Sequence, residues 1–111
     1  MSRKILIVLS EWGFWGEELI GPLEVFDAAG YESTFATPTG KRPVAITVSK
    51  DASYVDPPLG RPVTTAEMAA KVQAIDDPAN PRLNNPINLS TWFPMQPYWS
   101  APEVLRQWEN Y

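Results

Sequence analysis

The sequence predicts an α/β fold that begins as the N-terminal part of a doubly wound parallel sheet and continues into a proline-rich insertion of loops and short helices. Three observations support this prediction: a continuous apolar run near the N-terminus, a helical pattern directly after it, and the position of the prolines. Eleven of the twelve prolines fall between Pro38 and Pro102. We therefore divide the chain into residues 1–40, a βαβ unit, and residues 41–111, a Pro- and Trp-rich cap insertion.

The first predicted element is a strand over residues 4–10, Lys-Ile-Leu-Ile-Val-Leu-Ser. This continuous apolar run is rich in β-branched side chains, which is typical of a strand buried on both faces of a parallel sheet. A loop with two glycines follows in residues 11–16. An amphipathic helix that ends at Gly30 is then indicated by the spacing of four apolar residues, Leu19, Leu23, Val25 and Phe26.

A second strand is predicted over residues 31–37, with Phe35 and Ala36 as its most buried positions, and the turn-forming residues 38–40 stop it. Residues 1–40 therefore read as a βαβ unit, which the handedness rule makes parallel and right-handed. Because no other segment has a comparable strand pattern, only two strands of the sheet are expected.

The proline content of residues 41–111 excludes regular sheet and predicts loops with short helices. Residues 44–48 favour one short hairpin strand. Thr64 and Glu67 have the spacing of a capping box and predict a helix of about three turns that ends at residues 76–78. Residues 100–103 repeat this signature and predict a last helix.

Aromatic residues gather between these two helices, in residues 88–99. One interpretation is an aromatic wall over a ligand pocket. The other, which we favour, is that large, rigid side chains anchor an irregular segment that has no strand ladder to hold it. The aromatic residues concerned are Trp92, Phe93, Tyr98 and Trp99.

Composition excludes several classes of function. The chain has neither cysteine nor histidine, which rules out disulfides, a thiolate nucleophile of its own, Ser-His pairs and the usual zinc sites, so that no metal or cofactor is expected. Its charges are scattered and sum to −4, which argues against nucleic-acid binding. The apolar run near the N-terminus is too short for a signal peptide or a membrane span, so we expect a cytoplasmic protein.

The candidate site is the segment from Glu11 to Glu18, at the carboxyl end of the first strand, where α/β folds place their ligands. A carboxylate there serves as acid or base if burial raises its pKa, or shares a proton with a neighbouring thiol. We expect Glu18 to be catalytic, and Trp12, Trp15 and Glu17 to bind substrate. The alternatives are that the acids stabilise the helix N-terminus and face water, which is favoured for Glu17, and that the tryptophans pack against the helix.

Pro22 bears directly on the role of Glu18. Inside a helix, a proline leaves the carbonyl of the residue four positions earlier without a donor, and here that residue is Glu18. A helix bent at this point would turn Glu18 toward the strand ends. The alternative is that Pro22 marks a late helix start.

Four segments carry a resemblance to a known family: residues 4–9, the Glu18-x-x-x-Pro22 step, residues 27–31 and residues 35–38. Together they resemble the opening βαβ unit of the ThiJ/PfpI superfamily, whose fold is a flavodoxin-like doubly wound sheet. In that family a glutamate on the first helix, four residues before a proline, hydrogen-bonds the nucleophilic cysteine, and the resemblance implies this role for Glu18. The proline- and tryptophan-rich part is similar to the cap insertions of the larger chaperone and glyoxalase-like members.

The departure from the family is as informative as the match. Family members carry their cysteine on a strand-to-helix elbow, often beside a histidine, and this chain contains neither residue. The resemblance therefore implies no catalysis by this chain alone. It implies a hydrolase or hydro-lyase for small carbonyl or amide-like substrates once a companion chain or C-terminal segment supplies the cysteine, in a homo- or hetero-oligomer.

The incomplete sheet also indicates, on physical grounds, that this chain associates with another polypeptide. A two-stranded parallel sheet with one such apolar strand would expose its edges and an apolar face, which favours association. A split subunit, a cleaved piece and a truncated product remain open as its origin. The alternative to an enzyme is a non-catalytic binding or regulatory remnant that pairs through the open sheet edge. A nucleotide-binding role is less favoured, because the acidic loop lacks a glycine-rich cradle.

Overall fold

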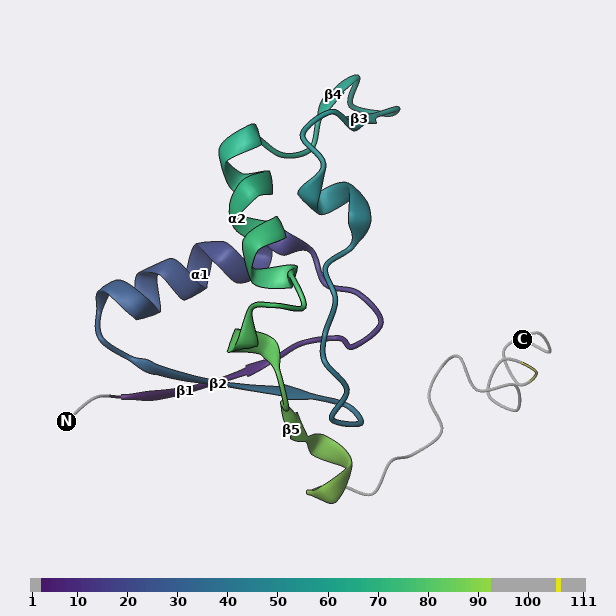
Figure 1. The fold of residues 1–111 in the computed structure, drawn as a ribbon. Coiled ribbons are helices and arrows are strands. Elements are labelled where there is room, and N and C mark those ends of the chain that lie inside the picture. The colour runs from purple at the N-terminus through teal and green to yellow at the C-terminus, as the bar shows by residue number, and fades with distance from the viewer. Residues whose placement is uncertain (1–2, 93–105, 107–111) are drawn as a thin grey trace.

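A computed structural model describes residues 3–92 and 106 of the chain. Within them the fold is a mixed α/β arrangement with a small parallel sheet of three strands in the order β1-β2-β5, two α-helices and a separate antiparallel hairpin, β3-β4 (Figure 1). The elements are β1 (Lys4–Val8), α1 (Gly16–Ala28), β2 (Glu32–Thr37), the 3-10 helix η1 (Thr47–Lys50), β3 (Val55–Asp56), β4 (Arg61–Pro62), α2 (Ala66–Asp76), η2 (Pro81–Leu83), β5 (Ile87–Asn88) and η3 (Leu89–Thr91).

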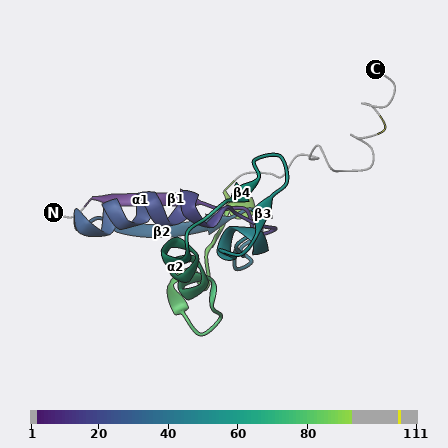
Figure 2. The same ribbon diagram turned by 90° about the horizontal axis from the view of Figure 1, so that it is seen from above.

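The predicted strand-helix-strand order of residues 1–40 is confirmed, and β1 and β2 are parallel neighbours in the sheet. Their ladder reaches one residue beyond β1 at each end: Glu32 N–H donates to the Arg3 carbonyl at 2.8 Å, and Leu9 N–H donates to the Ala36 carbonyl at 2.9 Å. α1 connects the two strands and lies along one face of the pair (Figures 1 and 2). In the part of the chain that the structure describes, no α-helix covers the opposite face.

The ends of α1 follow from its glycines and its proline. The helix begins at Gly16 and holds Pro22 in its interior, so the alternative of a helix start at Pro22 is wrong. Lacking an N–H, Pro22 donates no hydrogen bond to the carbonyl of Glu18. The helix ends near Gly30, as predicted, because the positive φ of 74° at this glycine lets the next residue donate its N–H back to the Phe26 carbonyl at 2.9 Å.

β5 corrects the prediction of only two strands. It runs parallel to β2, with Ile87 opposite Ala36 and Asn88 opposite Thr37. Gly40 permits this close approach, since a Cβ at that position would lie 2.9 Å from the Cβ of Asn88. Two residues are too few for a pattern of alternation, so the strand forms because β2 offers an edge and not because its own sequence specifies it.

The hairpin strand predicted over residues 44–48 is wrong. Ala45 instead forms an isolated parallel bridge with Phe14, whose N–H and carbonyl make backbone hydrogen bonds of 3.0 and 2.9 Å to the residues on either side of Ala45. The following residues form η1. Because the partner lies in the loop before α1 rather than in an adjacent strand, the local pattern could not reveal it.

The predicted helix after residue 64 is present as α2, but its N-cap is Thr65 and not Thr64. The hydroxyl of Thr65 accepts a hydrogen bond from the Met68 N–H at 3.1 Å, while Thr64 is buried. The predicted capping box of Thr64 and Glu67 is therefore wrong, because the residue three positions after the N-cap Thr65 is Met68 and not a glutamate or glutamine. The helix ends at Asp76, within the predicted boundary.

α1 and α2 pack directly against each other because Gly16 has no side chain. A Cβ at Gly16 would lie 2.4 Å from Cγ1 of Val72, a residue that is completely buried. The core lies where these helices meet β2 and η2, and it comprises Phe14, Leu19, Ile20, Leu23, Phe35, Ala45, Val72, Ile75 and Leu83.

Charged side chains join the end of α2 to residues 42–50. The guanidinium of Arg42 donates to the terminal carbonyls of the helix, including those of Ile75 at 3.2 Å and Asp76 at 3.1 Å. The Asp76 carboxylate accepts from the Ala45 N–H at 2.8 Å and from Lys50 Nζ at 2.6 Å. A cation at a helix C-terminus is favourable because it complements the helix dipole and satisfies carbonyls that lack intrahelical donors.

The structure describes residues 41–92 of the proline- and tryptophan-rich segment. Its described residues form loops, 3-10 helices, two-residue strands and α2, as its proline content indicated. Trp92 is 53 % exposed. The remaining aromatic residues of the proposed wall, Phe93, Tyr98 and Trp99, and the helix predicted after residue 100, apart from position 106, lie outside the described residues.

The contact between α1 and α2 predicts effects of different size for substitutions at two glycines of α1. Gly16→Ala should lower the free energy of unfolding by about 1 to 3 kcal/mol, because the rigid Val72 side chain cannot move aside. Gly21→Ala should have a smaller effect, because its new Cβ would meet nothing within 4 Å beyond the adjacent residues and the helix backbone, which leaves only crowding against the following Pro22. Urea unfolding of the two variants measures both, and equal effects would contradict the packing.

Asp76 predicts a pH dependence of stability. Burial raises the pKa of its carboxyl, but hydrogen bonds from Lys50 and the Ala45 N–H and the charges of Lys50 and Arg42 more than compensate, so that its pKa lies below the ordinary value of 3.8. A carboxyl whose pKa is lowered by folding stabilises the protein above its unfolded pKa and loses that contribution as pH falls through the folded pKa.

Asp76→Asn should therefore be destabilised most at neutral pH, and its difference from the wild type should shrink as the pH falls below about 4. Chemical unfolding of both proteins at pH 6 and pH 3 provides the measurement. A difference that stays constant over this range would show that the carboxylate is not held by these partners.

Candidate functional site

β1 is an edge strand with two different faces. In the order β1-β2-β5 it has, among the residues that the structure describes, a hydrogen-bonded neighbour on one side only. Leu6 and Val8 are 47 % and 56 % exposed, although the strand is apolar from Ile5 onward. Within the described residues, the prediction of a strand buried on both faces is therefore wrong, whereas the predicted open edge and exposed apolar face are present.

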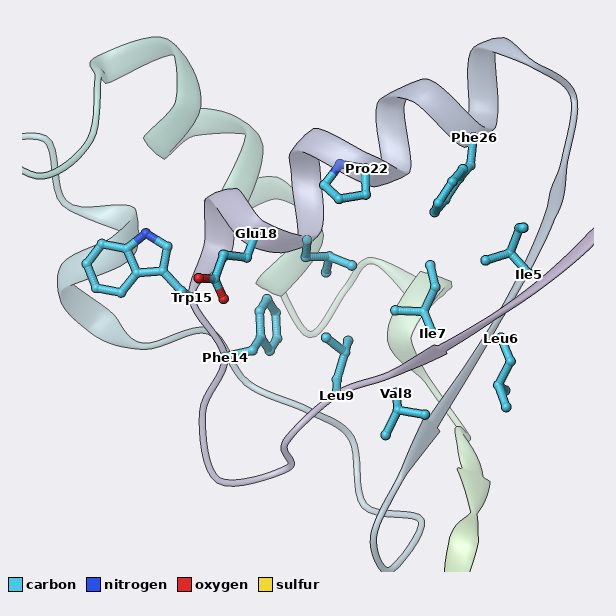
Figure 3. Close-up of a pocket in the computed structure, with 11 residues that line it drawn as sticks. Ile5, Leu6, Ile7, Val8, Leu9, Phe14, Trp15, Glu18, Pro22 and Phe26 are labelled. Atoms are coloured by element: carbon cyan, nitrogen blue, oxygen red, sulfur yellow. The ribbon is translucent and has the colours of Figure 1, made fainter.

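The other face of β1 lines an apolar groove beneath α1, with a cavity volume of about 360 Å³. Figure 3 shows Ile5, Ile7 and Leu9 pointing toward α1, and Leu6 and Val8 pointing away from it. The groove is lined by Ile5, Leu6, Ile7, Val8, Leu9, Phe14, Trp15, Glu18, Leu19, Pro22 and Phe26.

Of the carboxylates in the described part of the chain, Glu18 alone lines this groove. It lies in the first turn of α1, whose start is held by a hydrogen bond of 3.1 Å from the Gly16 N–H to the hydroxyl of buried Ser49. The Glu18 side chain is exposed and makes no hydrogen bond or ion pair with any described residue. Negative charge at a helix N-terminus is favourable, so the helix dipole stabilises the charged carboxylate of Glu18. Its oxygens remain available to another group.

The structure brings together two of the four residues predicted for the site. Trp15, at the N-cap of α1, is half-buried and lines the groove together with Glu18 (Figure 3). Trp12 is 70 % exposed, and neither it nor Glu17, which is exposed in the same helical turn as Glu18, lines the groove. Glu18 and Trp15 therefore form the candidate site.

Sequence reasoning missed the role of Glu11. This residue is only 7 % exposed, and its carboxylate accepts two hydrogen bonds from Thr39: one from the N–H at 2.6 Å and one from the hydroxyl at 2.5 Å. The interaction joins the loop after β1 to the turn after β2 at the carboxyl edge of the sheet. Its position directly after a strand was the only signal, and that signal does not distinguish a bound carboxylate from a free one.

Two properties of the described residues bear on the classes of function. They contain no group of three or more acidic, histidine or cysteine side chains placed to hold a metal ion. No helix among them has both the length and the apolar character needed to cross a bilayer.

Comparisons with known proteins add no assignment. No protein-family model matches this chain, and searches of curated proteins and of solved structures find no match. The resemblance to the ThiJ/PfpI superfamily therefore rests on the residues of this chain alone.

Glu11 predicts a stability effect that depends on its ability to accept hydrogen bonds. Glu11→Ala should lower the free energy of unfolding by about 1 to 3 kcal/mol, because the Thr39 N–H and hydroxyl lose their acceptor. Glu11→Gln, which keeps an acceptor oxygen and the same shape, should cost less. Urea unfolding measures both. Combining Glu11→Ala with Thr39→Val should be less than additive, and full additivity would contradict a direct interaction.

Proposed function

We propose that this chain is the N-terminal piece of a ThiJ/PfpI-like enzyme with a flavodoxin-like sheet, and that it contributes Glu18 to an active site completed by a cysteine from a companion chain or C-terminal segment. The observation that carries the proposal is the position of Glu18: an exposed carboxylate without a described partner, beside an apolar groove at the carboxyl end of an edge strand. Active sites of open α/β sheets form at this end of the strands.

The open edge of β1 supports the completion of the sheet. A doubly wound fold buries its first strand between neighbours on both sides and between helices on both faces, which explains why such a strand is apolar throughout. Here β1 has the required composition, but residues 3–92 give it only one neighbouring strand and one covering helix. A strand added along the free edge would bring its carboxyl end, and an elbow following it, close to Glu18.

The chemistry of such a site follows from a carboxyl group beside a thiol. A glutamate that hydrogen-bonds the sulfur shares a proton with it and regulates the fraction of nucleophilic thiolate. The thiolate would attack an electrophilic carbon of a small carbonyl or amide-like substrate, and Glu18 would return the proton to the developing oxygen or nitrogen. This chain has no cysteine, so the proposal assigns it no turnover of its own.

A second candidate is a non-catalytic binding or regulatory unit that pairs with another protein along β1. The observation in its favour is the exposed Leu6 and Val8 on the face opposite α1, which is independent of Glu18. An exposed apolar edge strand is a template for strand addition whether or not chemistry follows.

Native mass spectrometry of the protein isolated from its own source separates the two candidates. The enzyme proposal expects a complex between this 12.4 kDa chain, or a longer form of it, and a cysteine-containing polypeptide. The complex should convert a small α-oxoaldehyde or hydrolyse a small amide. A partner without cysteine, or a complex inert toward both substrates, would favour the binding unit.

For the assembled protein, Glu18→Gln should reduce kcat/KM by about two orders of magnitude, the usual contribution of a positioned acid or base. Glu67→Gln is the matched control, since this glutamate is exposed on α2 and lies away from the groove. Alkylation of the cysteine as a function of pH reports the thiol directly, and its profile should shift in Glu18→Gln only. Unchanged turnover in Glu18→Gln would remove this residue from the mechanism.

A further inference from the structure

The free edge of β1 presents a defined set of backbone groups. The Arg3 carbonyl and the Leu9 N–H both form hydrogen bonds with β2. Because backbone groups alternate in direction along a strand, those of Ile5 and Ile7 face β2 as well. The N–H and carbonyl groups of Lys4, Leu6 and Val8 therefore face outward. These residues contain no proline and no bulge, so Lys4 is the one usual feature against pairing that this edge carries.

Unpaired charges of opposite sign stand at the two ends of this edge. Arg3 and Lys4 are exposed at its amino end and form no ion pair with described residues. Glu17 and Glu18 are exposed at its carboxyl end, and their side chains are likewise unpaired in the described part of the chain. The edge is therefore apolar in the middle, basic at one end and acidic at the other.

We propose that the chain, in the absence of a companion, forms a homodimer in which two β1 strands pair antiparallel about Leu6 and join two three-stranded sheets into one. Antiparallel pairing places the basic end of each copy beside the acidic end of the other. Parallel pairing would place like charges together and would not close with two-fold symmetry.

The register follows from the outward-facing groups. Centring the pair on Leu6 opposes Leu6 to Leu6 and Lys4 to Val8, so that residues with outward-facing N–H and carbonyl groups exchange hydrogen bonds with each other. A shift of one residue would oppose outward-facing groups to groups already bonded to β2. The same pairing places the exposed Leu6 side chains of the two copies side by side, and each exposed Val8 beside Lys4 of the other copy, on the face opposite α1 (Figure 3).

This register also adds a residue to the candidate site. Arg3 alternates with Ile5, Ile7 and Leu9 and so belongs to the face that α1 covers. In the dimer the Arg3 of one copy lies opposite Leu9 of the other, and Leu9 lines the same groove as Glu18. The pair expected across the interface is therefore Arg3 with Glu18. A companion strand of the proposed enzyme would need the same edge, so it would have to displace the second copy.

Sedimentation equilibrium of the purified chain tests the inference without any companion. The chain should sediment with twice its monomer mass of 12.4 kDa at tens of micromolar. Arg3→Glu and Glu18→Lys should each weaken the dimer by about tenfold, because each dimer contains two such pairs and the change makes both repulsive. The double variant should restore dimerisation to within about threefold of the wild type.

Glu67→Lys, a charge reversal on α2, is the control and should leave the dimer constant unchanged. Circular dichroism of each variant confirms that the fold is retained. A monomer at 100 µM, or a double variant as weak as either single variant, would overturn the proposal. Either result leaves the enzyme proposal standing, since that is measured on the companion complex.

Discussion

Among the described residues, β1 is hydrogen-bonded along one edge only, and this determines which surfaces of the protein are accessible. The strand is apolar after its first residue, Lys4, yet it has a ladder with β2 on one edge, α1 over one face, and no described neighbour on the other edge or face. Apolar surface and unpaired backbone groups at one strand favour association with another polypeptide. The groove, the exposed Leu6 and Val8, and the accessibility of Glu18 all follow from this arrangement.

Two glutamates near the carboxyl end of β1 have different roles because their surroundings differ. Glu11 lies three residues after the end of β1 and is buried with both carboxylate oxygens accepting hydrogen bonds from Thr39. Glu18 lies one loop later, on the first turn of α1, and meets the groove without a described partner. The first joins two loops of the sheet edge, and the second is available for chemistry or for an ion pair.

The proline-rich part of the chain is attached to the βαβ unit by a few specific contacts. Gly16 admits Val72 at the crossing of α1 and α2, and Asp76 joins the end of α2 to Ala45 and Lys50. The bridge between Ala45 and Phe14 continues this attachment to the loop before α1. Residues far apart in the sequence thereby hold the beginning of α1, and with it Glu18, in place.

The sequence by itself determined the elements whose information is local: an apolar run long enough to be read as a strand, an amphipathic helix ended by a glycine, and a second helix after a threonine. It also indicated the exposed apolar edge, because two strands cannot cover such a run. Tertiary structure alone decided the rest. β5, the Ala45 bridge and the burial of Glu11 each depend on a partner some 28 to 51 residues away. Such contacts produce no periodic pattern of apolar residues in the sequence. A single backbone pairing or hydrogen bond fixes where two residues lie but does not require a repeat of residue types around them.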